Sequence, residues 1–189
     1  MIHTHQTAPT QFVEANGVRF AYRRFGKPNG VPLVFNQHYT GTMDHWDPAV
    51  ADGFAKDREV ILFNNAGVSS SSGEVPASFQ EMGANAVALI KALGLDKVDV
   101  LGFSIGGFVS QEITLAAPDL VRRLVLVGTG PRSGEGMDGG TPEGNRIFGA
   151  TRPITFGLAF SSRRHQPARR LAANFSSAFD FVRRIAIPK

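Results

Sequence analysis

Apolar residues along this chain fall into short unbroken runs separated by polar loops, a pattern typical of buried β-strands. Two longer stretches, 78–93 and 106–117, instead carry apolar residues at helical spacing. The runs that we predict as strands are 11–14, 18–25, 31–36, 59–63, 98–101 and 123–127. Strands that alternate with helices pair in parallel through right-handed crossovers. The pattern therefore predicts an α/β protein with a mostly parallel sheet.

Local signals mark the ends of two of these elements. Asn16 and Gly17 tolerate the positive φ that a type I′ turn needs, so they predict an antiparallel hairpin between the first two strands. Ser78 and Glu81 predict a capping box at the start of the first helix, and Gly94 ends that helix. Because the loops after parallel strands meet at one edge of a sheet, we expect the loops that follow the last four strands to converge.

One stretch, 98–107, breaks the pattern abruptly and reads V-D-V-L-G-F-S-I-G-G. Gly102 and Gly106 lie two residues before and two after Ser104, where a very tight turn leaves no room for a Cβ atom. Gly107 removes one more side chain where the following helix passes close to the strand. This spacing predicts a nucleophilic Ser104 on a sharp turn from strand to helix. A glycine-rich turn without a catalytic role is the alternative.

The composition limits the class of protein. A chain of 189 residues with 42% hydrophobic residues is enough for one domain with a buried core. The absence of cysteine excludes disulfides and thiolate chemistry, which leaves serine as the candidate nucleophile. No apolar run reaches the roughly 18 residues that span a membrane, and the first ten residues lack a signal-peptide core. We therefore expect a cytoplasmic protein.

Residues 12–130 resemble the α/β-hydrolases, in the group that includes esterases, lipases and cofactor-free haloperoxidases. The resemblance rests on the hairpin, the loop that ends in Trp46, the G-x-S-x-G pentapeptide and R-R-L-V-L-V-G at 122–128. It implies the α/β-hydrolase fold, with an N-terminal antiparallel hairpin and without the last strands of the family. It also implies chemistry without a cofactor.

The resemblance assigns the parts of an acyl-transfer site. Ser104 would be the nucleophile, and the backbone N–H groups of Ile105 and Tyr39 would hold the oxyanion. Gln37 and His38 occupy the two positions of the family's usual His-Gly dipeptide, and a residue other than glycine at position 38 restricts the loop.

Three residues near this loop and the nucleophile, His38, Trp46 and Phe103, are expected to contact the substrate. For His38 the alternative is a hydrogen-bonded loop histidine that does not touch the substrate. For Trp46 the alternative is packing beneath the loop.

Other polar residues receive no catalytic role. Asp44 and Asp47 match no recognised metal-ligand spacing, so we predict no metal site. Asn64 stands where relatives often carry aspartate, in a loop whose expected role is structural. His3 and His5 are expected to lie in a frayed terminus.

A serine nucleophile needs a histidine base and an acid that orients it, in the chain order Ser, Asp or Glu, His. His165 is the sole histidine after Ser104, and Asp138 gives an allowed order with it. His165 lies between arginine pairs, which disfavour its protonated form. Asp138 and His165 are therefore the candidate acid and base, and an incomplete triad is the alternative.

The charge changes sharply near residue 149. Residues 1–148 hold 12 Lys and Arg against 15 Asp and Glu, and residues 149–189 hold 8 against 1, so the net charges are about −3 and +7. We predict a hydrolase core over 1–148 and a basic tail over 149–189, partly helical at 168–185 or disordered. The tail fits an acidic partner, a membrane surface or nucleic acid, or alternatively a truncated or replaced C-terminus.

Together these features predict a serine hydrolase that acts on a small ester or related acyl substrate through an acyl-enzyme at Ser104. The alternative is a catalytically incomplete hydrolase-like fragment without turnover. The expected partner is a small acyl substrate, and we expect neither nucleic acid nor a membrane. Self-association through an exposed sheet edge is a further expectation.

Overall fold

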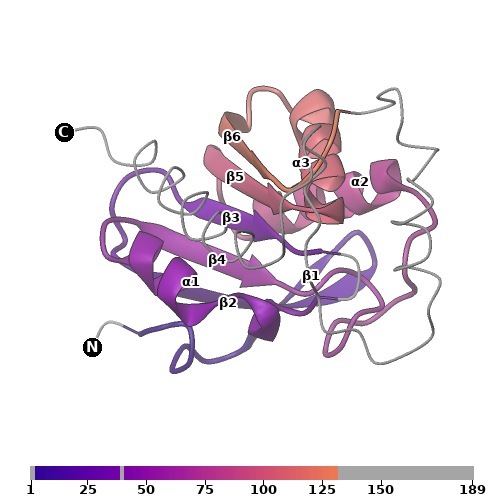
Figure 1. Cartoon of the computed structure of the whole chain (residues 1–189). Coiled ribbons are helices and arrows are strands. Elements are labelled where there is room, and N and C mark those ends of the chain that lie inside the picture. The colour runs from indigo at the N-terminus through magenta and orange to yellow at the C-terminus, as the bar shows by residue number, and fades with distance from the viewer. Residues whose placement is uncertain (1–2, 39–40, 132–189) are drawn as a thin grey trace, which may run out of the picture. The chain divides into compact units, whose positions relative to one another are not determined.

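The apolar runs of the sequence form one six-stranded sheet in the computed structural model, which describes residues 3–38 and 41–131 (Figure 1). The strands follow the spatial order β1-β2-β4-β3-β5-β6. Their bounds are β1 Gln11–Ala15, β2 Val18–Gly26, β3 Leu33–Asn36, β4 Glu59–Phe63, β5 Val98–Phe103 and β6 Val121–Val127. Strands β4, β3, β5 and β6 pair in parallel, and β2 joins β1 and β4 antiparallel. The predicted mostly parallel sheet with an N-terminal hairpin is confirmed.

The hairpin turn forms as its two residues predict. Asn16 has φ 50° and Gly17 has φ 74°, the pair of positive values that a type I′ turn requires. This turn pairs Ala15 with Val18 and so fixes the register of β1 on β2.

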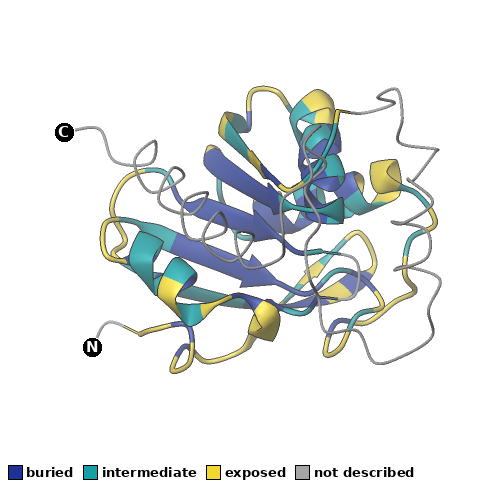
Figure 2. Cartoon of the chain, viewed as in Figure 1, coloured by how far each residue is buried: buried dark blue, intermediate teal, exposed yellow. Residues whose placement is uncertain are grey.

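In the described part of the chain, three α-helices and one 3-10 helix cover the sheet: η1 Met43–His45, α1 Pro48–Ala55, α2 Phe79–Ala92 and α3 Ile105–Ala116. Helices α2 and α3 pack on each other and, with Val34 of β3, belong to one apolar cluster. The next residue of β3, Phe35, points to the other face, where its ring meets that of Phe54 in α1 at 5.9 Å between centroids. The central strands are therefore buried between two helical layers (Figure 2).

The ends of α2 follow the sequence with one difference. Ser78 is the N-cap and its hydroxyl accepts from the backbone N–H of Glu81, as predicted. The Glu81 carboxylate, however, accepts from the N–H of Ala77 at 3.2 Å, so the reciprocal bond that a capping box needs is not made to Ser78. Gly94, with φ 72°, ends the helix.

The sequence pattern predicts no helix between the strands β3 and β4, but η1 and α1 both lie there. The 3-10 helix has three residues, too few to give a periodic signal. Helix α1 has eight residues, among them Gly53, which weakens its helical pattern. A local signal was present, since Asp47 caps α1 by accepting from Ala49 N–H at 2.8 Å and Pro48 is the first helical residue.

Some expectations stay predictions. The boundary at 148/149 and the tail lie outside the described residues. Strand β6 is the last strand in the described part of the sheet, and self-association through its outer edge stays a prediction. Within the described ranges the longest helix, α2, has 14 residues, and no helix there combines the length and apolarity that crossing a bilayer requires.

A buried ion cluster fastens the sheet at the amino end of β5. Asp99 is 2% exposed and accepts two hydrogen bonds from Arg122 of β6, at 2.9 and 2.7 Å, and one from Arg58 at 2.7 Å. Burial alone would raise the pKa of Asp99, but the hydrogen bonds from Arg122 and Arg58 outweigh it and hold this pKa below its ordinary value of 3.8. The cluster therefore ties β5 to β6 and to the residue that precedes β4.

We expect Asp99→Asn to lower the free energy of unfolding at pH 7 by about 3 kcal/mol, because it leaves Arg58 and Arg122 without their carboxylate. A carboxylate with a lowered folded-state pKa stabilises fully above its unfolded-state pKa, and this contribution disappears as the pH falls through the folded-state value. The difference from wild type should therefore shrink below about pH 3.8. Urea titrations at pH 7 and pH 3 measure it, with the exposed Asp96→Asn as the charge-matched control; equal midpoints at pH 7 would contradict it.

Candidate active site

Ser104 lies on the turn between β5 and α3, in a backbone conformation that residues other than glycine rarely adopt. Its φ is 55° and its ψ is −122°. The backbone N–H of Ser104 donates to the Val127 carbonyl of β6 at 2.9 Å, and its own carbonyl accepts from Gly107 N–H at 2.9 Å. These bonds hold the strained residue between β6 and the first turn of α3, as a strand-to-helix elbow requires.

The glycines around Ser104 make this close approach possible, each against a different neighbour. A Cβ on Gly102 would collide with the Gly106 carbonyl and the Ser110 hydroxyl of α3. A Cβ on Gly106 would collide with the Asn36 carbonyl at the end of β3. On Gly107 it would collide with the side chain of Thr129, just beyond β6. The predicted need for small residues at these positions is confirmed.

A buried polar pair beneath the turn, which sequence reasoning missed, ties β3 to α3. Asn36 Nδ2 donates to Ser110 Oγ at 3.0 Å, and Ser110 Oγ donates to the Gly106 carbonyl at 2.7 Å. Both side chains are at most 1% exposed. Polar residues in a buried strand end and a buried helix face were the available signal, because such groups must find hydrogen-bond partners.

The N–H of Ile105 lies at the start of α3, where the amide groups of the first turn point away from the helix and carry partial positive charge. Tyr39, the other expected oxyanion donor, is outside the described residues. Its neighbour His38 uses its own N–H to donate to Gln37 Oε1 at 2.8 Å. Gln37 Nε2 donates in turn to the Thr42 carbonyl at 3.0 Å, so the Gln37 side chain spans the base of this loop.

Aromatic rings gather beside Ser104 around Phe103, the residue before it. The Phe103 ring meets His38 edge-on at 6.0 Å between centroids and Trp46 at 6.3 Å. The His38 ring stacks on His45 at 6.0 Å. The three predicted substrate contacts, His38, Trp46 and Phe103, are thus brought together, while their contact with a substrate stays a prediction.

Trp46 is 5% exposed and its ring also packs edge-on against Phe35 at 4.8 Å, as the packing alternative expects. The pKa of His38 lies below its ordinary value of 6.5, because burial disfavours the charged imidazole and His45 adds to this effect. Burial therefore favours the uncharged ring of His38.

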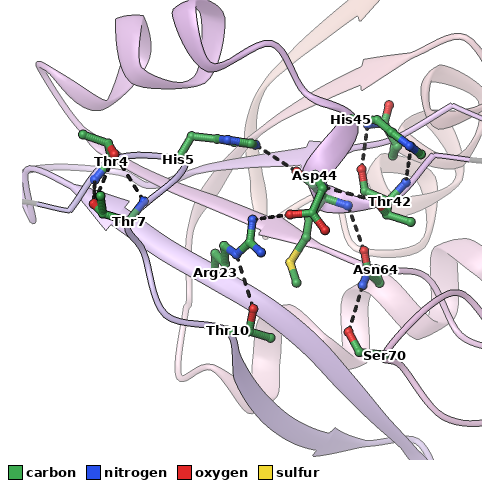
Figure 3. A network of polar contacts seen from close by, with 12 residues as sticks. Thr4, His5, Thr7, Thr10, Arg23, Thr42, Asp44, His45, Asn64 and Ser70 are labelled. Carbon is green, nitrogen blue, oxygen red and sulfur yellow. Dashed lines mark hydrogen bonds and ion pairs between the residues drawn. The ribbon is translucent and has the colours of Figure 1, made fainter.

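The acidic residues of the loop after β3 serve the loop itself. Asp44 pairs with Arg23 of β2 at 2.5 Å, and Asp47 caps α1. His45 Nδ1 accepts from Thr42 N–H at 3.0 Å, which closes the capping box of η1 (Figure 3). Among the described residues, no three His, Cys, Asp or Glu side chains gather as a metal site.

Two residues to which the sequence assigned no catalytic role hold this loop in place. Asn64, after β4, accepts from Met43 N–H at 2.8 Å and donates to Ser70 Oγ at 3.2 Å (Figure 3). The expectation that His5 lies in a frayed terminus is wrong, because its side chain is 4% exposed and bonds to the Met43 carbonyl. The candidate base His165 and acid Asp138 lie outside the described residues.

We expect Gly106→Ala to destabilise the protein by about 2 kcal/mol or more, because the added methyl group must displace the end of β3. Gly53→Ala is the matched control, since a Cβ at Gly53 meets nothing within 4 Å and alanine favours the helix by about 0.5–1 kcal/mol. Urea unfolding of both variants measures the contrast. A Gly106→Ala midpoint equal to that of wild type would contradict it.

For His38 we expect an NMR titration midpoint below 6.5, since burial and His45 lower its pKa. His45→Asn keeps an acceptor for Thr42 N–H and removes the neighbouring imidazole, so it should shift the His38 midpoint upward. Side-chain nitrogen shifts between pH 4 and 8 measure both values. A midpoint at or above 6.5 in the wild type would show that the ring is not held neutral.

Comparison with known proteins agrees with the fold. The sequence model described as alpha/beta hydrolase fold matches residues 31–185. Over 99 residues, 52% of this chain and 37% of the relative, the chain is 32% identical to a protein named as the carbamate hydrolase RutD of Azorhizobium caulinodans. Over 101 residues, 53% of this chain and 38% of the relative, it is 34% identical to a protein named as the non-heme bromoperoxidase BpoC of Mycobacterium tuberculosis.

A solved α/β-hydrolase fold protein from Chitinophaga pinensis is 46% identical with a TM-score of 0.68, covering 70% of this chain and 48% of that one. The chain thus spans less than half the length of these relatives. Because the family model covers well over half of the chain, the protein belongs to the α/β-hydrolase fold family.

Proposed function

We propose that the protein is a serine hydrolase that acts on small esters or related acyl compounds through an acyl-enzyme at Ser104. The observation that carries the proposal is the strained turn, with φ 55° at Ser104 and clash-free space only for glycine at 102 and 106. A residue held at such a cost is typical of a functional position. A glycine-rich turn without a function gives no reason to place serine, rather than glycine, at this φ.

In the proposed first half-reaction, Ser104 Oγ attacks the acyl carbon while a histidine accepts its proton. The tetrahedral oxyanion is stabilised by the N–H groups of Ile105 and Tyr39. The leaving alcohol or amine then takes the proton from the histidine, and the acyl group stays on Ser104. Water attacks this ester with the same base, which releases the acid and restores the serine hydroxyl.

The family order makes His165 the proposed base and Asp138 the proposed acid. The second oxyanion donor must lie in the loop after β3, and the N–H of His38 is already used by Gln37. This supports the next residue, Tyr39, as the donor. Metal ions and cofactors have no part in the proposed chemistry.

The ring cluster around Phe103, the residue before Ser104, supports a class of substrate. Phe103, Trp46 and a neutral His38 favour a small, uncharged acyl group over an anionic one. Esters, lactones and carbamates share the carbonyl that this site would attack, and one similar protein is named as a carbamate hydrolase. Acyl transfer to peroxide would use the same parts, in keeping with the relative named as a bromoperoxidase.

A fluorophosphonate probe, which phosphonylates activated serines, tests the proposal on the full chain. We expect wild type to be labelled and Ser104→Ala to lose labelling entirely, because the nucleophile is gone. Ser69→Ala, an exposed serine in another loop, is the matched control and should label like wild type. Mass spectrometry of the labelled peptide identifies the residue.

Absence of labelling in folded wild type would overturn the proposal and favour the alternative of a hydrolase-like chain without turnover. A separate variant, His165→Ala, tests the base. Its labelling rate should fall by about 10²–10⁴-fold, the usual contribution of a general base. An unchanged rate would exclude His165 as the base and leave Ser104 in place.

A further inference from the structure

His5 enters the protein body from a segment that precedes the first strand. The Thr4–Ala8 turn, in which Ala8 N–H donates to the Thr4 carbonyl at 2.9 Å, presents the side chain of His5 toward the sheet. The backbone N–H of His5 donates to Asp52 Oδ1 in α1 at 2.7 Å. Its ring packs edge-on against Phe25 of β2 at 6.3 Å and is 4% exposed.

The imidazole of His5 makes one specific bond, to the Met43 carbonyl. Nε2 lies 3.0 Å from that oxygen, and because a carbonyl can only accept, Nε2 carries the proton. Nδ1 is then unprotonated in this tautomer, and no hydrogen-bond partner for it exists among the described residues. The ring is therefore committed to a single polar contact, which lies on the loop after β3.

Met43 is held from two sides, with its N–H on Asn64 and its carbonyl on His5 (Figure 3). The adjacent residue Thr42 is bonded to the start of the loop, because its carbonyl accepts from Gln37 Nε2. Within the same loop, Gly41 N–H donates to the His38 carbonyl at 3.0 Å. Hydrogen bonds thus tie His5 to Met43, Gln37 to Thr42 and Gly41 to His38, so the residues on both sides of positions 39 and 40 in the chain are held.

We propose that His5 is a positioning residue for the loop after β3, the loop to which the proposed oxyanion donor Tyr39 belongs. His5 acts through its Nε2–H bond to the Met43 carbonyl. This inference rests on the proposed function, since it gives His5 a part in holding the second oxyanion donor. Hydrogen-bond donors to an oxyanion act only within a narrow distance range. A small displacement of this loop therefore lowers kcat and leaves the substrate affinity unchanged. The segment before β1 is thereby part of the active-site structure.

Two variants separate the hydrogen bond from the packing of the ring. His5→Phe keeps an aromatic ring against Phe25 and removes the donor. His5→Gln places an amide donor near the position of Nε2 and so can restore the bond to Met43. His3→Phe, at an exposed position in the same segment, is the matched control. All three variants keep the backbone N–H of residue 5, which donates to Asp52 Oδ1.

The first measurement is the rate constant of Ser104 labelling by a fluorophosphonate, together with kcat and KM for p-nitrophenyl acetate. We expect His5→Phe to lower the labelling rate and kcat by about tenfold to a hundredfold with KM within about twofold, as loss of part of an oxyanion contact predicts. In His5→Gln the labelling rate and kcat should recover to within about threefold of the wild-type values, and His3→Phe should have the wild-type values. Equal rates for His5→Phe and wild type, or a loss confined to KM, would overturn the proposal.

The second measurement is hydrogen exchange of the Thr42, Met43 and His45 amides, which requires no catalysis. These amides should exchange faster in His5→Phe and return toward the wild-type rate in His5→Gln. If wild type reacts with no probe, the proposed function fails while exchange still decides whether His5 holds the loop. Unchanged exchange in His5→Phe would overturn the role of His5 even in an active enzyme. Urea midpoints of all variants exclude global unfolding as the cause.

Discussion

The candidate site depends on how closely three backbones approach at Ser104. Strand β5 ends, α3 begins, and the end of β3 passes against the first turn of α3 with no side chain between them. Such an approach is possible only where Cβ atoms are missing, and it obliges Ser104 to take φ 55°. The Ser110 hydroxyl then satisfies the Gly106 carbonyl, which this contact removes from water, and Asn36 Nδ2 donates to the same hydroxyl. The geometry is thus fixed by excluded volume first and by hydrogen bonds second.

The loop after β3 is built in the opposite way. Polar contacts from four separate places hold its described residues: the Gln37 side chain, Arg23 of β2, Asn64 after β4 and His5 ahead of β1. A hydrogen-bonded loop can change sequence and keep its path, provided that its partners change with it. This explains how Gln37 and His38 can stand where the family usually has His-Gly. Gln37 supplies within the loop a bond to His38 N–H and a bond to the Thr42 carbonyl.

Sequence reasoning succeeded where the constraint is local. The hairpin follows from Asn16 and Gly17, helix α2 from its periodicity and Ser78, and the elbow from glycines at fixed offsets, because each signal lies within a few residues of its effect. It failed for His5, whose partners are 38 and 47 residues away in the chain. For Asn64 it predicted a structural loop but not the bond to Met43 N–H across 21 residues. No periodicity encodes such contacts. Helix α1 was missed for another reason, since eight residues with a glycine give a weak pattern and its real signal was the Asp47-Pro48 start.

The buried entry of His5 also bears on how the protein can be handled in the laboratory. The turn that presents His5 begins at Thr4, so a fusion partner or affinity tag joined directly ahead of it would pull on a segment bonded to Met43 and Asp52. A flexible spacer before the segment keeps such a partner away from these bonds. Residues 4–8 should accordingly be treated as part of the folded body when the protein is produced or redesigned.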